Sequence, residues 1–541
     1  MAGKLKSARD MDIHGKNIIG RERSGAGHET FRSYNPRQGA PSGEIFHAAS
    51  EEEIKRAGDL AGDAAAKLLD LSAEETAAFL DTVQEEILAL GEDLLHKADE
   101  ESALGLERLR GERDRTVNQI KMFSNLVREG SWVDARIDTP QPDRKPVPKP
   151  DVRRMLQPLG AVAVFGASNF PLAFSVAGGD TASAFAARNP VIVKAHPAHP
   201  GTSELVGDAI ARAVEKRSLP SGTFSMLHGM KPEVSIGLVT NPNVKAVAFT
   251  GSQRAGRALY NVAAQRPEPI PVFSEMGSVN PVFLLPSVLA NHAEAVAEGV
   301  YRSVTLGVGQ FCTCPGLMFA VEGEGLQKFE DHLAKQTEQG IPGTMLNAAV
   351  AKGFGSEFDK AASVPGVRVT IALRESDPQK TEGRPGVLTT EAQTWIKHQE
   401  LHEEIFGPAT VVVRCGSQAE LLECASALEG TLTATLHGTP EEIESSRELL
   451  SVLNRKAGRL IANGYPTGVE VGFAMQHGGP YPASTDPRFT SVGAAAIYRF
   501  ARPLCFQNFP DPALPAELQN ANPLRIWRMI DGRLTKDAVP Q

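Results

Sequence analysis

Four short apolar runs in the first half of the chain alternate with helical patterns. The runs cover 160–167 (GAVAVFGA), 190–197 (PVIVKAHP), 245–252 (KAVAFTGS) and 281–286 (PVFLLP), and the helical patterns cover 172–187, 203–216 and 254–265. Continuous apolar strands that alternate with helices are typical of a parallel sheet covered on both faces. Because crossovers between parallel strands are right-handed, the pattern predicts a doubly wound α/β unit with ligands at the carboxyl ends of its strands.

Helical segments are also predicted ahead of this unit. Ser50 with Glu53, and Ser72 with Glu75, form capping-box patterns that predict two helix starts. A third helix is predicted over 101–128. The polar, glycine-rich residues before these helices, 1–45, predict short strands and turns.

A proline-rich stretch interrupts the helical part of the chain at 137–152, which contains five prolines. Proline breaks helices and removes ladder donors, so this stretch is predicted to be an extended arm or linker. A second α/β alternation follows over 287–475, with a strand at 408–415. The tail after 503 is predicted to be an extension that packs on a partner surface.

Size and charge limit the number of domains and the classes of ligand that we expect. A chain of 541 residues is expected to hold two or three domains. The formal charge of −9, without clustered Lys and Arg, argues against nucleic acid as the main ligand. The N-terminus lacks the apolar core of a signal peptide, and no run of about eighteen apolar residues predicts a membrane span. The expectation is a soluble, cytoplasmic protein.

The five cysteines indicate reduced thiols of a cytosolic enzyme, because they are few and odd in number. The chain has no CxxC pair, so no metal site is predicted. Cys312 lies among small residues in LGVGQFCTCPG (306–316), where a substrate can approach the sulfur and backbone N–H groups can face it. A reactive thiolate needs a positive local field, and neither neighbour in sequence is Lys or Arg. In isolation, an inert buried cysteine explains this pattern better.

Two further side chains follow apolar strands. Glu275, in FSEMGSVNP (273–281), lies where a half-apolar setting suits a general base, although a capping or salt-bridged Glu fits equally well. Asn169, in FGASNFPLAF (165–174), follows a turn where its amide can face an oxyanion; the alternative is a turn-forming Asn.

A phosphate-binding pattern accompanies them. Lys194 ends a buried strand, where an unpaired cation is costly unless it faces a cleft. Gly251 and Gly256, in TGSQRAG (250–256), precede a helical pattern, and a glycine turn at a helix N-terminus suits a pyrophosphate. The spacing alone is weak evidence because many turns share it.

Taken together, six ordered segments resemble the aldehyde dehydrogenase superfamily over roughly residues 30–500. They are NFP (169–171), lysine 194, FTGS (249–252), EMG (275–277), GQxC (309–312) and EEIFGP (403–408). Three longer segments, 108–116, 179–204 and 466–485, resemble the subgroup of 2-oxoglutarate semialdehyde (2,5-dioxopentanoate) dehydrogenases. The NADP-preferring fatty-aldehyde dehydrogenases of luminous bacteria are similar in the same segments.

The resemblance implies a role for each matching residue. Cys312, and not Cys314, takes the place of the nucleophile, Glu275 that of the base, and Asn169 that of the oxyanion amide. The residues implied to bind the cofactor are Lys194, Gly251, Ser252, Glu404 and Phe406. Those implied at the substrate are Phe170 and, for an anionic substrate that needs a cation in the entrance tunnel, Arg113 or Arg115. A solvated helix face is the alternative for both arginines.

Three positions depart from the family pattern or refine it. Ser168 stands where many relatives carry an aromatic residue. Pro197 replaces the glutamate with which NAD-specific members bind the ribose 2′-hydroxyl, so NADP is the preferred cofactor, with NAD the alternative, and Lys231 or His196 would supply the countercharge. His477, in MQHGGP, aligns with a histidine near the active site of NADP-preferring relatives and either tunes the thiol and base or is structural.

The resemblance implies NAD(P)-dependent oxidation of an aldehyde to an acid through a cysteine thioester, with 2-oxoglutarate semialdehyde as the substrate. The alternatives are a dehydrogenase of medium- or long-chain aliphatic aldehydes, a CoA-acylating enzyme, a Cys–His hydrolase, and a catalytically inactive binding or structural protein. Glu275 argues against CoA acylation, since that reaction needs no water-activating base.

The predicted fold is therefore α/β with three parts. A Rossmann-like, doubly wound cofactor domain covers 1–136 and 153–277, a second α/β catalytic domain covers 278–476, and bridging or oligomerisation segments cover 137–152 and 477–541. The arm and tail predict a homodimer or homotetramer.

Overall fold

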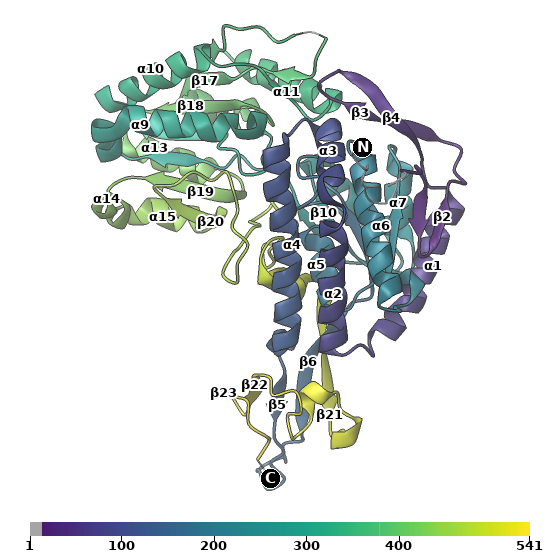
Figure 1. The fold of residues 1–541 in the computed structure, drawn as a ribbon. Coiled ribbons are helices and arrows are strands. Elements are labelled where there is room, and N and C mark those ends of the chain that lie inside the picture. The colour runs from purple at the N-terminus through teal and green to yellow at the C-terminus, as the bar shows by residue number, and fades with distance from the viewer. Residues whose placement is uncertain (1–12, 378, 541) are drawn as a thin grey trace, which may run out of the picture.

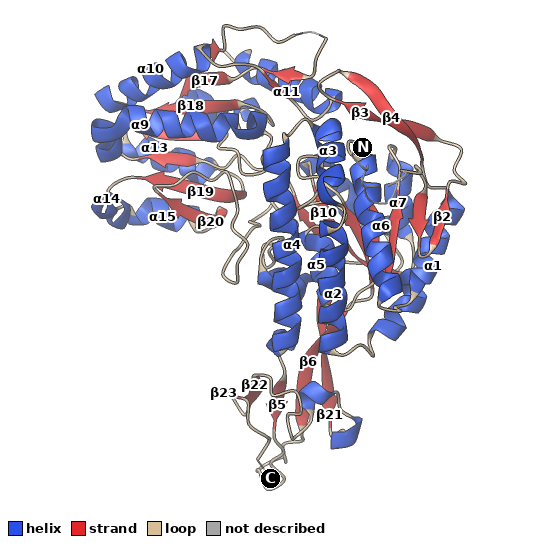
Figure 2. Ribbon diagram, in the orientation of Figure 1, coloured by secondary structure: helices blue, strands red, loops and turns tan. Residues whose placement is uncertain are grey.

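The computed structural model describes residues 13–377 and 379–540. It has two seven-stranded sheets, each flanked by helices, and a separate arm (Figures 1 and 2). The predicted α/β fold is confirmed. The expectation of strands and turns over 1–45 falls partly on residues 1–12, which lie outside the described residues; from residue 13 on, it is confirmed by four short strands.

The first sheet has the strand order β11-β10-β7-β8-β9-β1-β2. Its strands are β11 (Val272–Glu275), β10 (Val244–Thr250), β7 (Ala161–Phe165), β8 (Val191–Lys194), β9 (Phe224–Leu227), β1 (Asn17–Ile19) and β2 (Glu22–Ser24). The first five are parallel, and β1 and β2 add antiparallel strands at one edge. The predicted strands at 160–167, 190–197 and 245–252 are β7, β8 and β10.

Helices cover both faces of this sheet, as its continuous apolar strands predict. Val162 and Val164 of β7 pack into one core, while Ala161 and Ala163 pack into the other. The first core is covered by α2 (Ala73–Leu88), α4 (Leu106–Glu129), α5 (Gly179–Ala186) and α6 (Pro200–Lys216). The second is covered by α1 (Glu51–Leu68), α7 (Pro232–Thr240) and α8 (Gln253–Ala264).

The second sheet has the order β15-β17-β18-β13-β12-β19-β20 and is parallel except for β15. Its strands are β15 (Arg368–Ile371), β17 (Gly386–Glu391), β18 (Ala409–Cys415), β13 (Leu317–Val321), β12 (Val282–Leu284), β19 (Thr431–His437) and β20 (Ala457–Ala462). The predicted strand at 281–286 is thus β12 and belongs to this sheet, not to the first.

The helices of the second unit are α9 (Pro286–Thr305), α10 (Glu324–Glu338), α11 (Ala348–Ala362), α12 (Ala392–Lys397), α13 (Gln418–Ala427), α14 (Pro440–Ser445) and α15 (Arg447–Leu453). Helices α9 and α10 share one core with β12 and β13, and α12, α13 and α15 share the other. Two small ribbons complete the body: β3 (Thr30–Asn35) with β4 (Ala40–His47), and β14 (Gly343–Thr344) with β16 (Glu382–Gly383).

The arm projects away from both large sheets at the bottom of Figure 1. It is a five-stranded sheet in the order β21-β6-β5-β22-β23, made of β21 (Ala501–Gln507), β6 (Val152–Pro158), β5 (Arg136–Asp138), β22 (Arg528–Ile530) and β23 (Arg533–Thr535). The proline-rich stretch lies in the arm and contains no described helix, but it turns back on itself, since Gln141 and Lys149 form an antiparallel bridge between β5 and β6. Strand β6 pairs only within the arm sheet among the described strands, so residues 153–158 lie with the arm and not with the cofactor domain to which the sequence assigned them.

Two helix predictions need correction. Both capping boxes form, at the starts of α1 and α2. The predicted helix over 101–128, however, is divided between α3 (Gly91–Ser102) and α4, because Ala103 (φ 57°) and Gly105 (φ 88°) adopt left-handed backbone conformations. The predicted helix over 172–187 forms only as the shorter α5, preceded by turns. No described helix is long and apolar enough to cross a membrane.

Candidate active site

The carboxyl ends of four parallel strands of the first sheet meet at one edge. Asn169 follows β7, Lys194 ends β8, Gly251 follows β10 and Glu275 ends β11. Backbone hydrogen bonds tie these ends together, since Gly251 N–H donates to the Glu275 carbonyl at 3.1 Å. The sequence therefore brings its predicted catalytic and cofactor residues to the edge where doubly wound sheets bind ligands.

The second unit contributes two loops to the same place. Cys312 lies before β13, and Glu404 and Phe406 lie before β18, which is the neighbour of β13 in the sheet. Together the two units enclose a cavity of about 490 Å³. Its lining includes Asn169, Phe170, His196, Gly251, Ser252, Glu275, Cys312, Glu404 and Phe406.

A tight left-handed turn sets the path of the chain into Cys312. Gly307, Val308 and Gly309 all have positive φ, between 56° and 67°. A Cβ on Gly309 would lie 2.1 Å from the carbonyl oxygen of Gly407, so the two loops touch backbone to backbone. Val308, a β-branched residue, is strained in this conformation. The turn is therefore held by its surroundings and not by its own sequence preference.

Asn280 anchors the backbone around the sulfur. Its side chain is buried, and its Nδ2 donates to the carbonyl oxygens of Cys312 and Cys314, each at 2.9 Å. Gln310 adds a second anchor, since Leu346 N–H donates to its Oε1 at 3.0 Å. Both buried amides are satisfied, which favours a rigid loop.

The two cysteines of this loop have different environments. Cys312 is partly exposed and lines the cavity, whereas Cys314 is buried and directs its sulfur at the Val304 carbonyl, 3.7 Å away. Burial raises the pKa of the Cys314 thiol well above its ordinary value, and its sulfur faces the protein interior and not the cavity. An inert thiol behaves in this way, so the placement agrees with the prediction that Cys312, and not Cys314, reacts.

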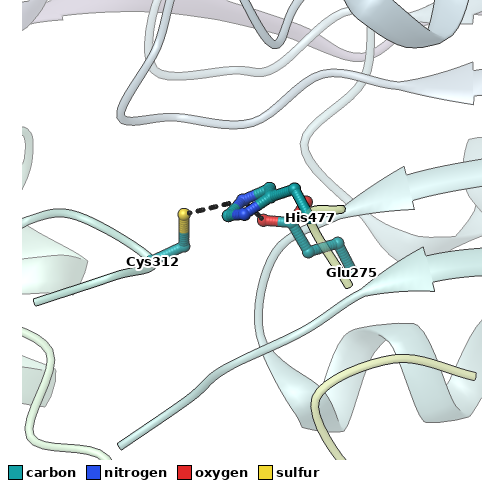
Figure 3. A group of neighbouring side chains, drawn as sticks. All are labelled: Glu275, Cys312 and His477. Atoms are coloured by element: carbon teal, nitrogen blue, oxygen red, sulfur yellow. Dashed lines mark hydrogen bonds and ion pairs between the residues drawn. The ribbon is translucent and has the colours of Figure 1, made fainter. Parts of the chain in front are cut away.

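Cys312, His477 and Glu275 form a contiguous group (Figure 3). The Cys312 Sγ lies 3.5 Å from His477 Nε2, and the same nitrogen lies 3.0 Å from Glu275 Oε1. His477 is buried, with 1% of its side chain exposed. The sequence left open whether this histidine is structural; the structure places its ring between the predicted nucleophile and the predicted base.

The hydrogen-bonding environment keeps the Glu275 carboxyl ionised. Burial by itself would raise the pKa of Glu275, but His477 and hydrogen bonds from Ser491 and Cys312 outweigh it and hold the pKa below its ordinary value. Conversely, burial raises the pKa of the Cys312 thiol well above its ordinary value, and the charge on Glu275 raises it further. The resting pair is thus a thiol beside a carboxylate.

Asn169 lies on the opposite side of the sulfur loop. Its Nδ2 donates to the Gln310 carbonyl at 3.0 Å, and the side chain lines the cavity that also contains Cys312. One amide hydrogen therefore fixes the side chain, and the other is left for a ligand in the cavity; the oxyanion role stays a prediction.

Helix α4 carries both arginines that the sequence predicted at the substrate, Arg113 and Arg115. The Arg115 guanidinium lies 6.0 Å from the ring centroid of Phe170 and 5.4 Å from that of Phe174. The positive charge of Arg115 offsets part of the rise that burial causes in the pKa of Cys312. Arg113 instead pairs with its neighbour Asp114 at 3.2 Å and does not line the cavity, because it lies on another face of the helix. Neither arginine is among the residues that line the cavity, but Arg115 lies over Phe170 and Phe174, which do line it.

The other end of the cavity has the features of a nucleotide site. Ser252 caps α8 by accepting from Ala255 N–H at 3.4 Å, and Gly251 precedes it, so the N-terminal end of the helix faces the cavity. Burial raises the pKa of Glu404 to about 8. A carboxyl group in this state can accept from or donate to ribose hydroxyls.

The cations predicted at the nucleotide end have separate locations. Lys194 is buried, and burial lowers its pKa to about 8. His196 lines the cavity, and burial together with His199 and Lys194 lowers its pKa well below the ordinary value. Lys231 is different: its side chain is 61% exposed and pairs with Glu29. Lys231 thus has a carboxylate partner of its own, and of these three residues only His196 is among those that line the cavity.

Several residues of the site were not found from the sequence. Arg108 donates to the Asn169 carbonyl at 2.8 Å and lies 4.8 Å from the Phe311 ring centroid. Ser491 donates to Glu275, and Asn280 anchors the sulfur loop. The helical spacing of 108, 112 and 115 was a usable signal, because residues at i, i+4 and i+7 share one face. Nothing local marks Ser491 or Asn280, whose partners are more than thirty residues away.

Comparison with known proteins agrees with this geometry. The sequence model described as the aldehyde dehydrogenase family matches residues 23–481, and the chain belongs to this family. It is an NAD(P)-dependent aldehyde dehydrogenase.

Two relatives are similar over nearly the whole chain. The alpha-ketoglutaric semialdehyde dehydrogenase 2 of Azospirillum brasilense is 48% identical over 526 residues, covering 97% of this chain and 100% of that protein. The alpha-ketoglutaric semialdehyde dehydrogenase of Acinetobacter baylyi is 41% identical over 525 residues, covering 97% and 99%. Among solved structures, a betaine aldehyde dehydrogenase of Staphylococcus aureus shares the fold with a TM-score of 0.78 at 18% identity, covering 93% of this chain and 97% of that one.

Proposed function

We propose that the protein oxidises 2-oxoglutarate semialdehyde to 2-oxoglutarate, with NADP as the preferred cofactor and water as the acyl acceptor. The names of the two full-length relatives support the substrate. The observation that carries the proposal is the environment of Arg115. No hydrogen bond or ion pair to this guanidinium occurs among the described residues, and its Nε and Nη2 are buried without a partner.

An unpaired buried guanidinium is costly unless a ligand neutralises it. Burial lowers the pKa of Arg115, and the nearest opposing charge, on Glu112, is only a partial compensation. The Glu112 carboxylate itself accepts hydrogen bonds from the backbone N–H groups of Leu172 and Ala173, at 2.8 and 3.0 Å. A carboxylate on the far end of a short aldehyde would give Arg115 the bidentate partner that it lacks.

The apolar walls beside Arg115 define the shape of the substrate site. Phe170, Phe174 and Phe311 pack edge to face, with ring centroids 5.2 and 5.5 Å from that of Phe170. They exclude water around the aldehyde chain and leave Arg115 as the polar end. An aliphatic aldehyde of greater length would place methylene groups against this cation, which disfavours it.

In the proposed reaction, the Cys312 sulfur attacks the aldehyde carbon and forms a carbon–sulfur bond. The thiol loses its proton to water in the cavity that Cys312 lines, and the Asn169 amide donates to the developing oxyanion. Loss of hydride from the tetrahedral adduct leaves a thioester on Cys312. When bound in the cavity, the oxidised nicotinamide cofactor supplies the hydride acceptor.

Glu275 then accepts a proton from water, whose oxygen attacks the thioester carbonyl carbon. The carbon–sulfur bond breaks, the acid leaves, and Cys312 regains its proton. Overall the aldehyde, water and the oxidised cofactor give the acid, the reduced cofactor and one proton, before the acid ionises. A base that is ionised at rest, as Glu275 is, suits this step, and the CoA-acylating alternative has no need of it.

The residues of the cavity fit a nicotinamide dinucleotide. Gly251 and Ser252 at the start of α8 would hold the pyrophosphate, and Glu404 the nicotinamide ribose. Pro197 leaves no carboxylate at its position to repel a 2′-phosphate, and Lys194 with His196 provides cationic or hydrogen-bonding groups. Solved relatives include one with bound NAD and one described as NADP dependent, so the preference for NADP rests on these residues of the chain.

The test is a panel of initial rates with 2-oxoglutarate semialdehyde, succinic semialdehyde and pentanal, each with NAD and with NADP and without CoA. The account expects the highest kcat/KM for 2-oxoglutarate semialdehyde with NADP. A higher kcat/KM for pentanal would contradict the anionic substrate, a requirement for CoA would contradict hydrolysis, and a higher kcat/KM with NAD would contradict the cofactor preference alone.

We also propose a homodimer or homotetramer, built through the arm. Strand β21 pairs with β6 on one side and exposes alternate residues, while Phe509, Trp527 and Leu534 of the arm are exposed apolar side chains. An exposed edge strand with apolar neighbours is covered in most proteins. The proposed compartment is the cytoplasm, where five free cysteines remain reduced.

A further inference from the structure

The group shown in Figure 3 combines three donor types that a single soft cation prefers. Cys312 offers sulfur, His477 an imidazole nitrogen and Glu275 a carboxylate oxygen, and these atoms lie within 4.8 Å of one another. The sequence predicted no metal site, because the three residues are 37 and 165 positions apart around Cys312 and form no local motif.

Two of the three donor-atom separations are close to those around a tetrahedral zinc ion. With Zn–S of about 2.3 Å, Zn–N and Zn–O of about 2.1 Å, tetrahedral geometry places sulfur and nitrogen ~3.6 Å apart and nitrogen and oxygen ~3.4 Å apart. The structure has 3.5 Å between Sγ and Nε2, and 3.0 Å between Nε2 and Oε1. These two separations are within ~0.4 Å of the tetrahedral values, and the Cys312 sulfur and the Glu275 carboxylate oxygen lie within 4.8 Å of each other.

The charges also balance. A zinc-bound Cys312 is a thiolate, and with the Glu275 carboxylate it neutralises the two charges of Zn²⁺. Arg115 is a cation whose charge acts on Cys312. The second group of this kind, His14 with Glu204 and Asp208, differs in that Arg23 already pairs with Asp208 and backbone N–H groups of His14 and Gly15 occupy Glu204.

We propose that Zn²⁺ binds reversibly to Cys312, His477 and Glu275, displaces the thiol proton, and inhibits the enzyme by occupying the nucleophile and the base together. The cavity that admits aldehyde gives access, because Cys312 and Glu275 both line it. The fourth position of the ion would hold water from the cavity. The inhibition does not depend on which aldehyde or cofactor the enzyme prefers, so its failure would leave the proposed function untouched.

Selectivity among cations follows from the donor set. Thiolate and imidazole favour Zn²⁺ and Co²⁺, whereas Mg²⁺ prefers oxygen ligands in octahedral geometry. We therefore expect micromolar Zn²⁺ to inhibit and millimolar Mg²⁺ to leave the rate within ~2-fold. Addition of a chelator should restore the activity, since no covalent bond to carbon forms.

Direct binding is measured with Co²⁺ on the full-length, chelator-treated protein without cofactor. The expected result is one equivalent of Co²⁺ per chain, with a thiolate-to-cobalt absorption band and the intense visible bands of a tetrahedral ion, displaced by Zn²⁺. Zn²⁺ should also release about one proton per ion and protect Cys312 from alkylation by iodoacetamide.

Matched variants assign the ligands. His477→Asn and Glu275→Gln should each weaken Co²⁺ and Zn²⁺ binding by at least ~10-fold, which is the smallest loss seen when even an outer-shell partner is removed. Cys312→Ser should abolish the charge-transfer band. Cys505→Ser removes an exposed thiol far along the chain and should leave binding, protection and activity unchanged. Circular dichroism of each variant checks folding.

Three outcomes would overturn the proposal. They are absence of the thiolate band in the folded wild-type protein, equal Co²⁺ affinity of wild type and His477→Asn, or loss of the band in Cys505→Ser. The second outcome would mean that Zn²⁺ binds the thiol alone, and the third that it binds at the surface.

Discussion

The loop that carries Cys312 and two cations near the cavity, Arg115 and Lys194, differ in how their polar groups are satisfied. Around Cys312, the buried amides of Asn280 and Gln310 are all engaged with backbone groups of the protein. The Nε and Nη2 atoms of Arg115 and the side chain of Lys194 are also buried, yet neither residue has a side-chain hydrogen bond or an ion pair among residues 13–377 and 379–540.

The difference separates scaffold from binding site. A satisfied buried network holds a loop in one conformation, whereas a buried cation without a partner has its full interaction available to a ligand. The substrate carboxylate and the cofactor phosphate are the anions that the proposed reaction brings to these two positions. Substitutions in the sulfur loop and at the two cations, each compared with a control variant, test this difference.

The largest effect is expected within the sulfur loop. Cys312→Ala should lower kcat at least ~10⁴-fold, because the thioester pathway is lost. Cys314→Ala, which removes a thiol two residues away that faces the protein interior, should keep kcat within about 3-fold. Steady-state rates of both purified variants check this. Equal losses would mean that the two thiols cannot be distinguished by their exposure to the cavity.

Gly309→Ala tests whether the loop conformation matters. The added Cβ would meet the Gly407 carbonyl in a left-handed backbone conformation, so the loop must shift and misplace the sulfur. A displacement of about 1 Å is expected to lower kcat roughly 100-fold. Gly355→Ala, in α11 with open space around it, is the control and should have no effect. An unchanged kcat for Gly309→Ala would show that the loop is adaptable.

Substitution of Arg115, with Arg113 as the control, tests whether a cation binds the substrate carboxylate. Arg115→Met should lower kcat/KM for 2-oxoglutarate semialdehyde by about 10- to 100-fold, the value of a charge-assisted hydrogen bond of ~1.5–3 kcal/mol. Its kcat/KM for pentanal should not fall, and Arg113→Met should behave like wild type because Arg113 pairs with Asp114. Equal losses on both aldehydes would assign Arg115 a structural role.

The smallest effect is a pH dependence at the nucleotide end. Burial lowers the pKa of Lys194 to about 8, so its charge is present below that pH and is lost as the pH rises through it. If the cofactor phosphate requires the charged amine, KM for NADP should rise about 10-fold between pH 7 and pH 9. Lys194→Arg keeps its charge and should flatten the profile. A flat profile in the wild type would mean that the phosphate does not contact Lys194.

Much of the fold could be predicted because it depends on local patterns. Continuous apolar runs predicted the strands of the first sheet, and Ser50 with Glu53 predicted a helix start that the structure confirms. The break at Ala103 escaped prediction, since alanine favours helix and its left-handed conformation is imposed by packing. The cofactor domain was predicted to begin at residue 153, whereas residues 153–158 pair in the arm sheet, because partners in β21 more than 340 positions away cannot be read from their own sequence.

The residues of the candidate site could likewise be predicted only in part. Cys312, Glu275 and Asn169 could be proposed from the resemblance, and the structure brings them around one cavity. His477 was found but not its position between sulfur and carboxylate, and Ser491 was not found at all. Such contacts depend on how residues 477–491 return to the end of β11, which no local pattern encodes. Lys231 shows the reverse case, in which a plausible cation turns out to be exposed and paired with Glu29.

The most direct test of the central claim is a single-turnover experiment with Glu275→Gln. The variant keeps the shape of the base and removes its ability to accept a proton from water. Mixed with NADP and 2-oxoglutarate semialdehyde, it should produce one equivalent of NADPH per site in a burst, with no steady-state rate, and mass spectrometry should find the acyl group on the peptide containing Cys312. Steady turnover at the wild-type rate, or an acyl group on any residue other than Cys312, would contradict the account.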